Sequence, residues 1–365
     1  MTRCFSVCRP IVALVLAFLF VAPGVYAGYS VVEIGVLSGD AMTTATDVNN
    51  AGWVVGQSIA TGYTSYRAIL WDPTTQSTSA LTTSNGSAWG INDNNEVVGF
   101  YNVSSSLSHG FYWTTGGGLV DLTHPDQGSS QGSGAYDINS DSLIGGLAGY
   151  KYPPYGTRGV LWNGPSDAAP VMLPTLGGTM SEIRAVNSLG HAVGISTATS
   201  VPLAFFWDGS TMTGLGTLPG GARSYAYGMN DSDVIVGSSE GTGAGAVYWT
   251  YDGSSWTIHP LGGGWANDIN NDGLIVGYNS TGKGTLWDSG VAIDLNTLIP
   301  AGSGWILGYA YGISDSGYIV GVGTLDGVQR GYLLAPMAPV PAPGALVLCA
   351  VGGALAAVTR RRKGS

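Results

Sequence analysis

Residues 268–277 read "DINNDGLIVG", and this stretch carries the strongest fold signal in the chain because versions of it recur six more times. The other copies read "DVNNAGWVVG", "GINDNNEVVG", "DINSDSLIGG", "AVNSLGHAVG", "GMNDSDVIVG" and "GISDSGYIVG". Their key positions are 43, 47, 48, 43, 40 and 44 residues apart, and a glycine follows each one seven residues later. Self-similarity at such a period indicates a repeat architecture. The key positions are Asn49, Asn92, Asn139, Asn187, Asn230, Asn270 and Ser314.

Each copy continues into a second motif, which has a small residue and two apolar residues before a tryptophan. Examples are "RAILW", which ends at Trp71, and "KGTLW", which ends at Trp287; the seventh copy, "RGYLL", has Leu334 instead. Short β-branched and aromatic runs alternate with Asn, Asp, Gly and Ser, which is the pattern of strands and turns. About four strands in roughly 44 residues is the size of one propeller blade. The sequence therefore predicts an all-β, seven-bladed β-propeller, with a solenoid as the alternative.

The two ends of the repeat region complement each other. After the seventh second motif the chain turns to "APMAPVPAP", so the last repeat lacks its final strand. A strand of matching character, "YSVVEIGVLSG", stands at residues 29–39. We expect this N-terminal strand to complete the last blade, close the ring and remove the exposed sheet edges. A solenoid needs no such exchange, so closure favours the propeller.

The terminal segments predict export. Residues 1–27 combine basic Arg3 and Arg9, an apolar run and the small-residue ending "VYA", which is the three-part pattern of a signal peptide. The segment 337–365 holds a proline-marked break, an apolar run and a basic cluster. That run is shorter than the roughly 20 residues of a comfortable membrane-spanning helix. The basic cluster favours the cytoplasmic side, which would leave the propeller, residues 28–336, outside the membrane.

The C-terminal segment resembles a PEP-CTERM sorting signal, which exosortase-type transpeptidases recognise in bacteria that make exopolysaccharide. The motif residues are Val340, Pro341, Ala342, Pro343, Arg360, Arg361 and Arg362. Ala342 stands where the family has its name-giving glutamate, so retention as a single-pass anchor stays open beside cleavage. The resemblance implies that signal peptidase and an exosortase-type enzyme are partners during export. It also implies a final location in the cell envelope or extracellular matrix.

The repeats themselves resemble the HAF repeats of bacterial exported proteins. The resemblance rests on "LGTLPGGARSYAYGMNDSDVIVG" (215–237) and "LAFFW" (203–207) and extends over nearly all of residues 30–335. The family is named for a His-Ala-Phe triplet at the second motif; here the histidine survives only at His109. The resemblance implies an extracellular repeat protein and supplies no catalytic residues.

Charge and cysteine content narrow the classes of function. All 23 acidic residues lie between residues 28 and 336, against seven Lys and Arg, which gives a net charge near −16. Such a surface argues against nucleic-acid binding because little would neutralise the phosphates. Cys4, Cys8 and Cys349 all fall in the terminal segments. The propeller is therefore expected to be held together by packing without disulfides.

The stretch "DINNDG" also begins as an oxygen-rich calcium loop does, with Asp268, Asn270 and Asp272 at alternate positions. The other copies keep the turn chemistry of Asn, Asp and Gly but not the ligand set. A helical-hand calcium loop would also need a glutamate at its twelfth position, where this chain has Asn279. We therefore expect a structural hairpin, with calcium as the alternative and no other cofactor.

Two sets of residues are candidates for ligand binding. The residue that opens the second motif is basic in five copies, which in a propeller would place these side chains on one ring. They either pair with nearby acids, for little stabilisation each, or form a cationic arc that binds an anionic polymer. Three tryptophans outside the repeat pattern either pack half-buried or stack on sugar rings. The candidates are Arg67, His109, Arg158, Lys283 and Arg330, with Trp89, Trp265 and Trp305.

These features predict an exported, envelope-associated protein that binds extracellular polysaccharide or matrix without catalysis. No group of residues with a catalytic spacing stands out, and the four histidines lie in different repeats. One alternative is a structural surface protein without a specific ligand. Another is a glycan hydrolase or lyase that uses the central pocket of the propeller. The fold alone cannot choose among them, because propellers host many functions.

Overall fold

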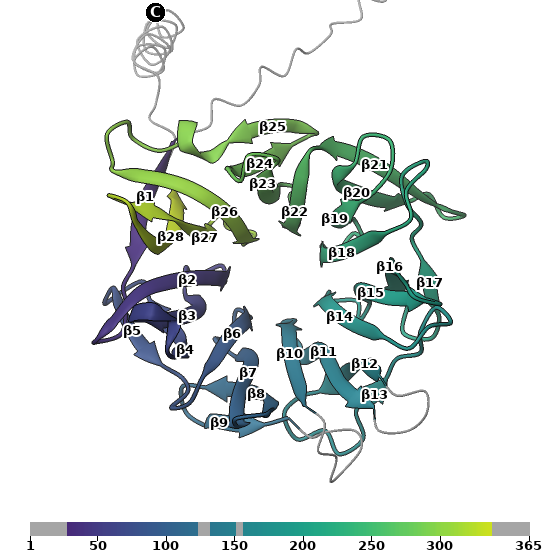
Figure 1. Ribbon diagram of the computed structural model, residues 1–365, viewed down its shortest axis with the longest axis horizontal. Helices are drawn as coiled ribbons and strands as arrows, with labels where there is room; N and C mark the ends of the chain where they lie inside the picture. Colours follow the sequence, from purple (N-terminus) through teal and green to yellow (C-terminus); the bar gives the residue numbers. More distant parts are fainter. Residues whose placement is uncertain (1–27, 123–131, 151–155, 338–365) are drawn as a thin grey trace, which may run out of the picture. The chain divides into compact units, whose positions relative to one another are not determined.

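The repeated strand-and-turn units build seven four-stranded antiparallel sheets around a central channel (Figure 1). The computed structural model describes residues 28–122, 132–150 and 156–337. This arrangement confirms the seven-bladed propeller and excludes the solenoid. The expected signal peptide and sorting tail lie outside the described residues. Within the described ranges, no helix is long and apolar enough to cross a membrane.

Six blades each use four consecutive strands, ordered from the channel outward. Blade 1 holds β2 (Asp40–Val48), β3 (Val54–Ala60), β4 (Tyr66–Asp72) and β5 (Ser77–Ala80), and blade 2 holds β6 (Gly86–Ile91), β7 (Val97–Ser104), β8 (Leu107–Thr114) and β9 (Gly118–Asp121). Blade 3 holds β10 (Ser133–Ile138), β11 (Leu143–Tyr150), β12 (Gly156–Asn163) and β13 (Val171–Met172), and blade 4 holds β14 (Ser181–Val186), β15 (Ala192–Ala198), β16 (Val201–Trp207) and β17 (Met212–Gly214). Blade 5 holds β18 (Ser224–Met229), β19 (Ile235–Ser239), β20 (Gly245–Tyr251) and β21 (Trp256–Gly262), and blade 6 holds β22 (Gly264–Ile269), β23 (Ile275–Asn279), β24 (Gly284–Asp288) and β25 (Val291–Asp294). Two short 3-10 helices, η1 (Thr61–Tyr63) and η2 (Leu295–Thr297), follow β3 and β25.

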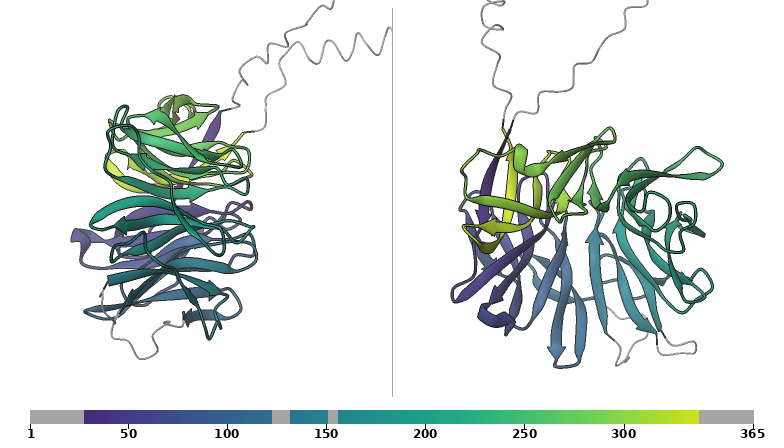
Figure 2. Two further views of the ribbon diagram at one scale, coloured as in Figure 1. Left: turned by 90° about the vertical axis from the view of Figure 1, so that its right-hand side faces the viewer. Right: turned by 45° about the horizontal axis from the view of Figure 1, so that its top comes forward.

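The seventh blade is shared between the two ends of the propeller. Its three inner strands are β26 (Trp305–Ile313), β27 (Ile319–Leu325) and β28 (Val328–Pro336), and its outer strand is β1 (Tyr29–Ile34). Strand β1 pairs antiparallel with β28, from Tyr29 opposite Pro336 to Ile34 opposite Gly331. Figure 2 shows the purple β1 beside the yellow β28. The predicted closure by the N-terminal strand is confirmed.

A β-bulge in every inner strand explains the invariant glycine of the repeat. In each blade the register between the first two strands skips one residue, such as Asn267 between Ala266 and Asp268. A bulge bends the strand and leaves one residue out of the ladder. A Cβ at Gly277, on the neighbouring strand, would overlap the carbonyl oxygen of Trp265. The same overlap with an inner-strand carbonyl arises at Gly56, Gly99, Gly146, Gly194, Gly237 and Gly321.

The hydrophobic core lies between neighbouring blades. In one cluster Trp71 and Val54 of blade 1 pack with Val320 and Leu333 of blade 7. Burial of each such large side chain stabilises the fold by roughly 1.5–3 kcal/mol. The residue that ends the second motif is buried in six blades and half-buried at Trp113. The buried ones are Trp71, Trp162, Trp207, Trp249, Trp287 and Leu334.

Replacing Gly277 by alanine should destabilise the propeller, because the new methyl group meets a backbone carbonyl that cannot move without breaking the bulge. We expect a loss of about 1–3 kcal/mol in the free energy of unfolding, measured by urea denaturation. The matched control is Gly116→Ala, where a Cβ would meet no neighbouring atom. Equal stability of the two variants would contradict the proposed role of the glycine.

Candidate functional site: the central channel and its aromatic mouth

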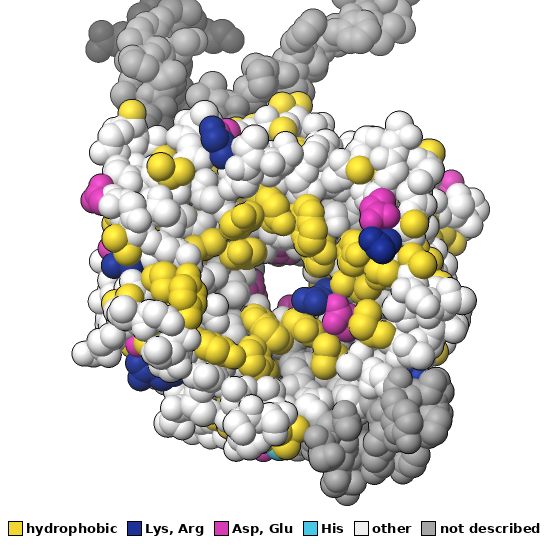
Figure 3. Space-filling model, viewed as in Figure 1, with side chains coloured by type: hydrophobic (Ala, Val, Ile, Leu, Met, Phe, Trp, Pro, Cys, Tyr) yellow, Lys and Arg dark blue, Asp and Glu magenta, His cyan; other side chains and the backbone are white. Residues whose placement is uncertain are grey.

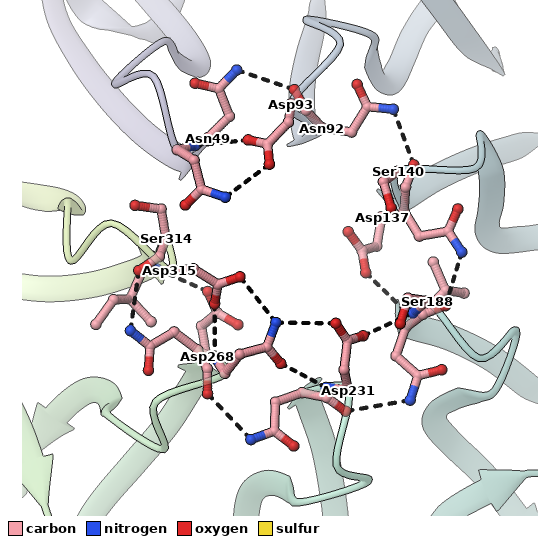
Figure 4. Close-up of a pocket in the computed structure, with 18 of the residues that line it drawn as sticks. Asn49, Asn92, Asp93, Asp137, Ser140, Ser188, Asp231, Asp268, Ser314 and Asp315 are labelled. Atoms are coloured by element: carbon pink, nitrogen blue, oxygen red, sulfur yellow. Dashed lines mark hydrogen bonds between the residues drawn. The ribbon is translucent and has the colours of Figure 1, made fainter.

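The repeated asparagines surround one end of the channel (Figure 4). In the turn between β22 and β23, the Asn270 Oδ1 accepts a hydrogen bond from the backbone N–H of Leu274 at 2.9 Å. The Asn270 Nδ2 donates to the carbonyl of Ser314 in the next blade at 3.1 Å. Five other asparagines make the same blade-to-blade bond, over 2.8–3.3 Å (Figure 4): Asn49, Asn92, Asn139, Asn187 and Asn230.

The step from blade 7 to blade 1 uses a different bond, because Ser314 has no amide to donate. There the backbone N–H of Ser316 donates to Asn50 Oδ1 at 2.9 Å. The residues after the key asparagines add further links; for example, the Asn271 backbone N–H donates to Asp315 Oδ1 at 2.7 Å. We call this set of bonds the amide ring. It confirms the prediction that the repeated stretch is a structural hairpin.

The three calcium candidates have separate roles in this arrangement. Both carboxylate oxygens of Asp268 accept backbone N–H groups, from Ile269 and Ile313, at 2.8 Å each. Asn270 belongs to the amide ring, and Asp272 is exposed. Within the described ranges, no group of three His, Cys, Asp or Glu is placed to hold a metal ion. Calcium binding by these residues stays a prediction, and two of the three already serve the protein's own hydrogen bonds.

The bulged residues line the middle of the channel, because they leave the strand ladder. Each stands three positions before the key residue of its blade. They surround a cavity of about 140 Å³ together with three aspartates, Asp47, Asp137 and Asp268. The bulged residues are Thr46, Trp89, Tyr136, Arg184, Tyr227, Asn267 and Tyr311.

Aromatic side chains surround the other mouth of the channel, and Figure 3 shows hydrophobic side chains around this opening with acidic ones inside it. The rings of Trp89 and Tyr136 stack with centroids 4.5 Å apart, and the Arg184 guanidinium lies 4.2 Å from the Tyr136 ring centre. Across the opening, Tyr227 and Trp265 stack at 5.5 Å. We call the whole set the aromatic girdle: Trp89, Phe100, Tyr136, Tyr225, Tyr227, Trp265, Tyr278, Tyr309 and Tyr311.

The girdle offers accessible ring surface. Trp265 is 43% exposed and Tyr309 is 40% exposed. Arg184 brings little net charge, because Glu182 Oε1 accepts its guanidinium N–H at 2.6 Å. Exposed aromatic faces with a few fixed polar groups are suited to ligands that have both apolar and hydroxyl-bearing sides.

The three channel aspartates connect pairs of blades. One oxygen of each accepts the N–H of the following residue, and the other accepts an N–H of the next blade, as Asp137 does from Val186 at 2.8 Å. Withdrawal from water raises the pKa of Asp137 to about 6 and that of Asp268 to about 7. The pKa of Asp47 is also raised well above its usual value, first by burial and then by the charges of Asp268 and Asp137.

The predicted basic positions all have partners within the propeller. They lie near the start of the third strand of their blades. Arg67 pairs with Asp40 at 3.1 Å, and Arg330 pairs with Glu33 at 2.7 Å. His109 lies 3.1 Å from Asp121, Lys283 lies 3.5 Å from Asp294, and Arg158 donates to the carbonyls of Thr157 and Thr179. Intramolecular pairing therefore accounts for this ring, and its action as a cationic arc stays a prediction.

The structure separates the three candidate tryptophans. Trp89 and Trp265 both join the girdle. Trp305 instead packs edge-on against buried Tyr332, with centroids 6.2 Å apart, at the far end of β26.

Sequence analysis missed the girdle tyrosines and Arg184. Reading the position three before each key residue across all copies would have found four of the girdle's members and the arginine in one column.

Comparisons with known proteins support the fold alone. No protein-family model matches the chain, and no curated protein matches it. Among solved structures, the β-propeller domain of the Trilobed protease from Pyrococcus furiosus superposes with a TM-score of 0.54 at 11% identity, covering 81% of this chain and 95% of that one. A puromycin-hydrolyzing peptidase from Mycobacterium tuberculosis gives a TM-score of 0.52 at 14% identity, covering 87% of this chain and 57% of that one. Identities this low show a shared propeller and carry no activity across.

Because of the channel aspartates, we expect the stability of the propeller to fall as pH rises from about 4 to about 7. Their pKa values are higher in the folded channel than the roughly 3.9 of an unfolded aspartate, so the folded state holds protons that the unfolded state releases. This stabilisation is complete below the unfolded pKa and is lost as pH rises through the folded values near 6 and 7. We expect a change of roughly 1–3 kcal/mol in the unfolding free energy, after allowance for screening by water in the channel.

Urea denaturation at several pH values measures this effect. Asp137→Asn should reduce the pH dependence between about 4 and 7, because one of the three titrating groups is removed, whereas Asp326→Asn, at an exposed turn, should leave it unchanged. A pH profile identical in all three proteins would show that the channel carboxylates do not titrate as described.

Proposed function

We propose that this protein is an exported, envelope-associated binding protein whose ligand is an extracellular polysaccharide, held at the aromatic girdle. The observation that carries the proposal is the two groups of packed aromatic rings at the channel mouth, of which Trp265 and Tyr309 are the most exposed. Sugar rings present an apolar face of C–H groups and an edge of hydroxyls. Aromatic stacking against that face, with hydrogen bonds at the edge, is the contact that the girdle can supply.

The charge of the site favours a neutral polysaccharide. The side chains of Asp47, Asp137 and Asp268 lie below the girdle, and the nearby Arg184 is already paired with Glu182. An anionic chain would meet these carboxylates without a free cation to offset them. The predicted cationic arc lies outside the girdle, on residues that already pair with acids of the propeller.

Binding is favoured over catalysis for the same site. A glycoside hydrolase needs two carboxyl groups free to act as acid and as base or nucleophile. Both oxygens of each channel aspartate accept backbone N–H groups from two blades. These carboxylates therefore serve as links between blades. Export is supported by the N-terminal signal pattern and by the resemblance of residues 340–365 to a sorting signal.

Titration of the purified protein with neutral hexasaccharides of several linkages, and with an anionic uronic acid polymer, tests the proposal. Trp265→Ala and Tyr309→Ala should each weaken binding of a neutral hexasaccharide about tenfold, since one aromatic contact contributes roughly 0.5–1.5 kcal/mol beyond burial. Val291→Ala, at an exposed apolar position on the outer strand of blade 6, is the matched control and should bind normally.

Other outcomes separate the alternatives. Salt-sensitive binding of the anionic polymer that is lost on changing Arg67 and Lys283 to Gln would overturn the neutral-ligand assignment in favour of the cationic arc. Absence of binding to every polymer would overturn the proposal in favour of a purely structural surface protein. Cleavage of any hexasaccharide would favour the enzyme.

A further inference from the structure

A second cleft lies between blades 4 and 5, on the face opposite the aromatic girdle. Its volume is about 660 Å³. Two of its residues, His191 and Asp233, come from the hairpins β14–β15 and β18–β19, which also carry the amide-ring residues Asn187 and Asn230. The cleft is therefore separated from the girdle by the thickness of the propeller.

One wall of this cleft is aromatic. The rings of Phe206 and Trp256 lie 4.9 Å apart, and those of Tyr251 and Trp256 lie 5.2 Å apart. Trp256 packs against the core between the two blades, which fixes its position. Tyr251 is 53% exposed, so its ring contributes little to the packing of the propeller. This wall offers a rigid inner ring and an accessible outer one.

The facing side is polar and supplies acceptors. His191 Nδ1 lies 2.9 Å from Asp233 Oδ1, which also accepts from the side-chain amide of Asn187 at 2.8 Å. Asp208 Oδ1 accepts hydrogen bonds from the backbone N–H groups of Thr211 and Ser210 in the turn that follows it. These bonds lower the pKa of the Asp208 carboxyl. The Oδ2 atoms of both aspartates and the Nε2 of His191 have no hydrogen-bond partner among the described residues.

The repeat does not require these side chains. The position four residues after the key asparagine is His191 here and Trp53, Glu96, Leu143, Val234, Leu274 and Tyr318 in the other blades. A histidine and aspartate pair opposite an aromatic wall is thus particular to one junction. The amide ring uses Asp233 Oδ1, which accepts from Asn187, and makes no use of Asp233 Oδ2 or His191 Nε2.

We propose that the cleft between blades 4 and 5 is a binding site for a sugar residue of a neutral glycan. The apolar face of a pyranose ring stacks on Tyr251 and Trp256, while its hydroxyls donate to the free carboxylate oxygens of Asp208 and Asp233. Carboxylate acceptors opposite an aromatic wall are complementary to a ligand rich in hydroxyl donors. No Lys or Arg lines the cleft, so an anionic ligand finds no counter-charge there.

A site on each face gives the protein a further capability. With one glycan held at the girdle and another in the cleft, a single propeller links two polysaccharide chains. This linking rests on the proposed function of the girdle, whereas the cleft site stands without it.

Calorimetric titration of the purified protein with cellohexaose, laminarihexaose, maltohexaose and mannohexaose tests the cleft and the girdle separately. The wild type should bind two molecules of the preferred hexasaccharide. Tyr251→Ala should weaken one of the two binding events at least tenfold and leave the other intact. Trp265→Ala should do the reverse, and the double variant should lose both. Trp256→Ala supplies a second cleft variant, read together with its melting temperature because Trp256 also packs on the core.

The outcomes for the two sites are distinguishable. Wild-type binding that Tyr251→Ala leaves unchanged, with a normal melting temperature, overturns the cleft proposal and spares the girdle. Binding that Tyr251→Ala abolishes and Trp265→Ala does not affect supports the cleft and overturns the girdle. Failure of the wild type to bind any of the four hexasaccharides overturns both.

Discussion

Each blade of this propeller is fastened to the next by a side-chain amide that donates across the junction to a backbone carbonyl. The donor asparagines of the ring are buried, as at Asn49 and Asn270, which are 3% exposed. A hydrogen bond of this kind contributes about 1 kcal/mol, but a buried amide or carbonyl left without its partner costs more. The one junction that lacks a donating amide, at Ser314, is closed through Asn50 and by the pairing of β1 with β28.

This constraint made the fold predictable from the sequence. In six blades an asparagine at the turn reaches the next blade, and in all seven a glycine follows seven residues later to face the bulge, as Asn270 and Gly277 do. Both features depend on backbone geometry, so they recur along the chain and reveal the period. The outer strand of the last blade was predictable for the same reason, because an unpaired β28 would leave an exposed edge.

The site could be predicted only in part, because its members become neighbours only when the ring closes. Trp89 and Tyr136 are 47 residues apart in sequence, yet their rings stack at 4.5 Å. Local spacing also does not show the contacts between blades. Asp268 and Asn270 suggest a calcium loop when read along the chain, but their side chains point into separate blade-to-blade contacts. Nothing in the local sequence of Asp137 indicates that two other channel carboxylates lie near it.

The same geometry determines where side chains are free to vary. At the turn end of each inner strand the amide ring fixes residue identity, whereas the bulged position three residues earlier projects into the channel without a partner in the ladder. That position accordingly differs among blades, from Thr46 to Trp89 to Arg184. A binding surface can change there without loss of the fold. The junction of blades 4 and 5 follows the same rule. The backbone N–H of His191 donates to Asn187 Oδ1 and so holds the hairpin, but the hairpin makes no use of the His191 side chain. Function in this propeller is therefore expected where the copies of its repeat disagree.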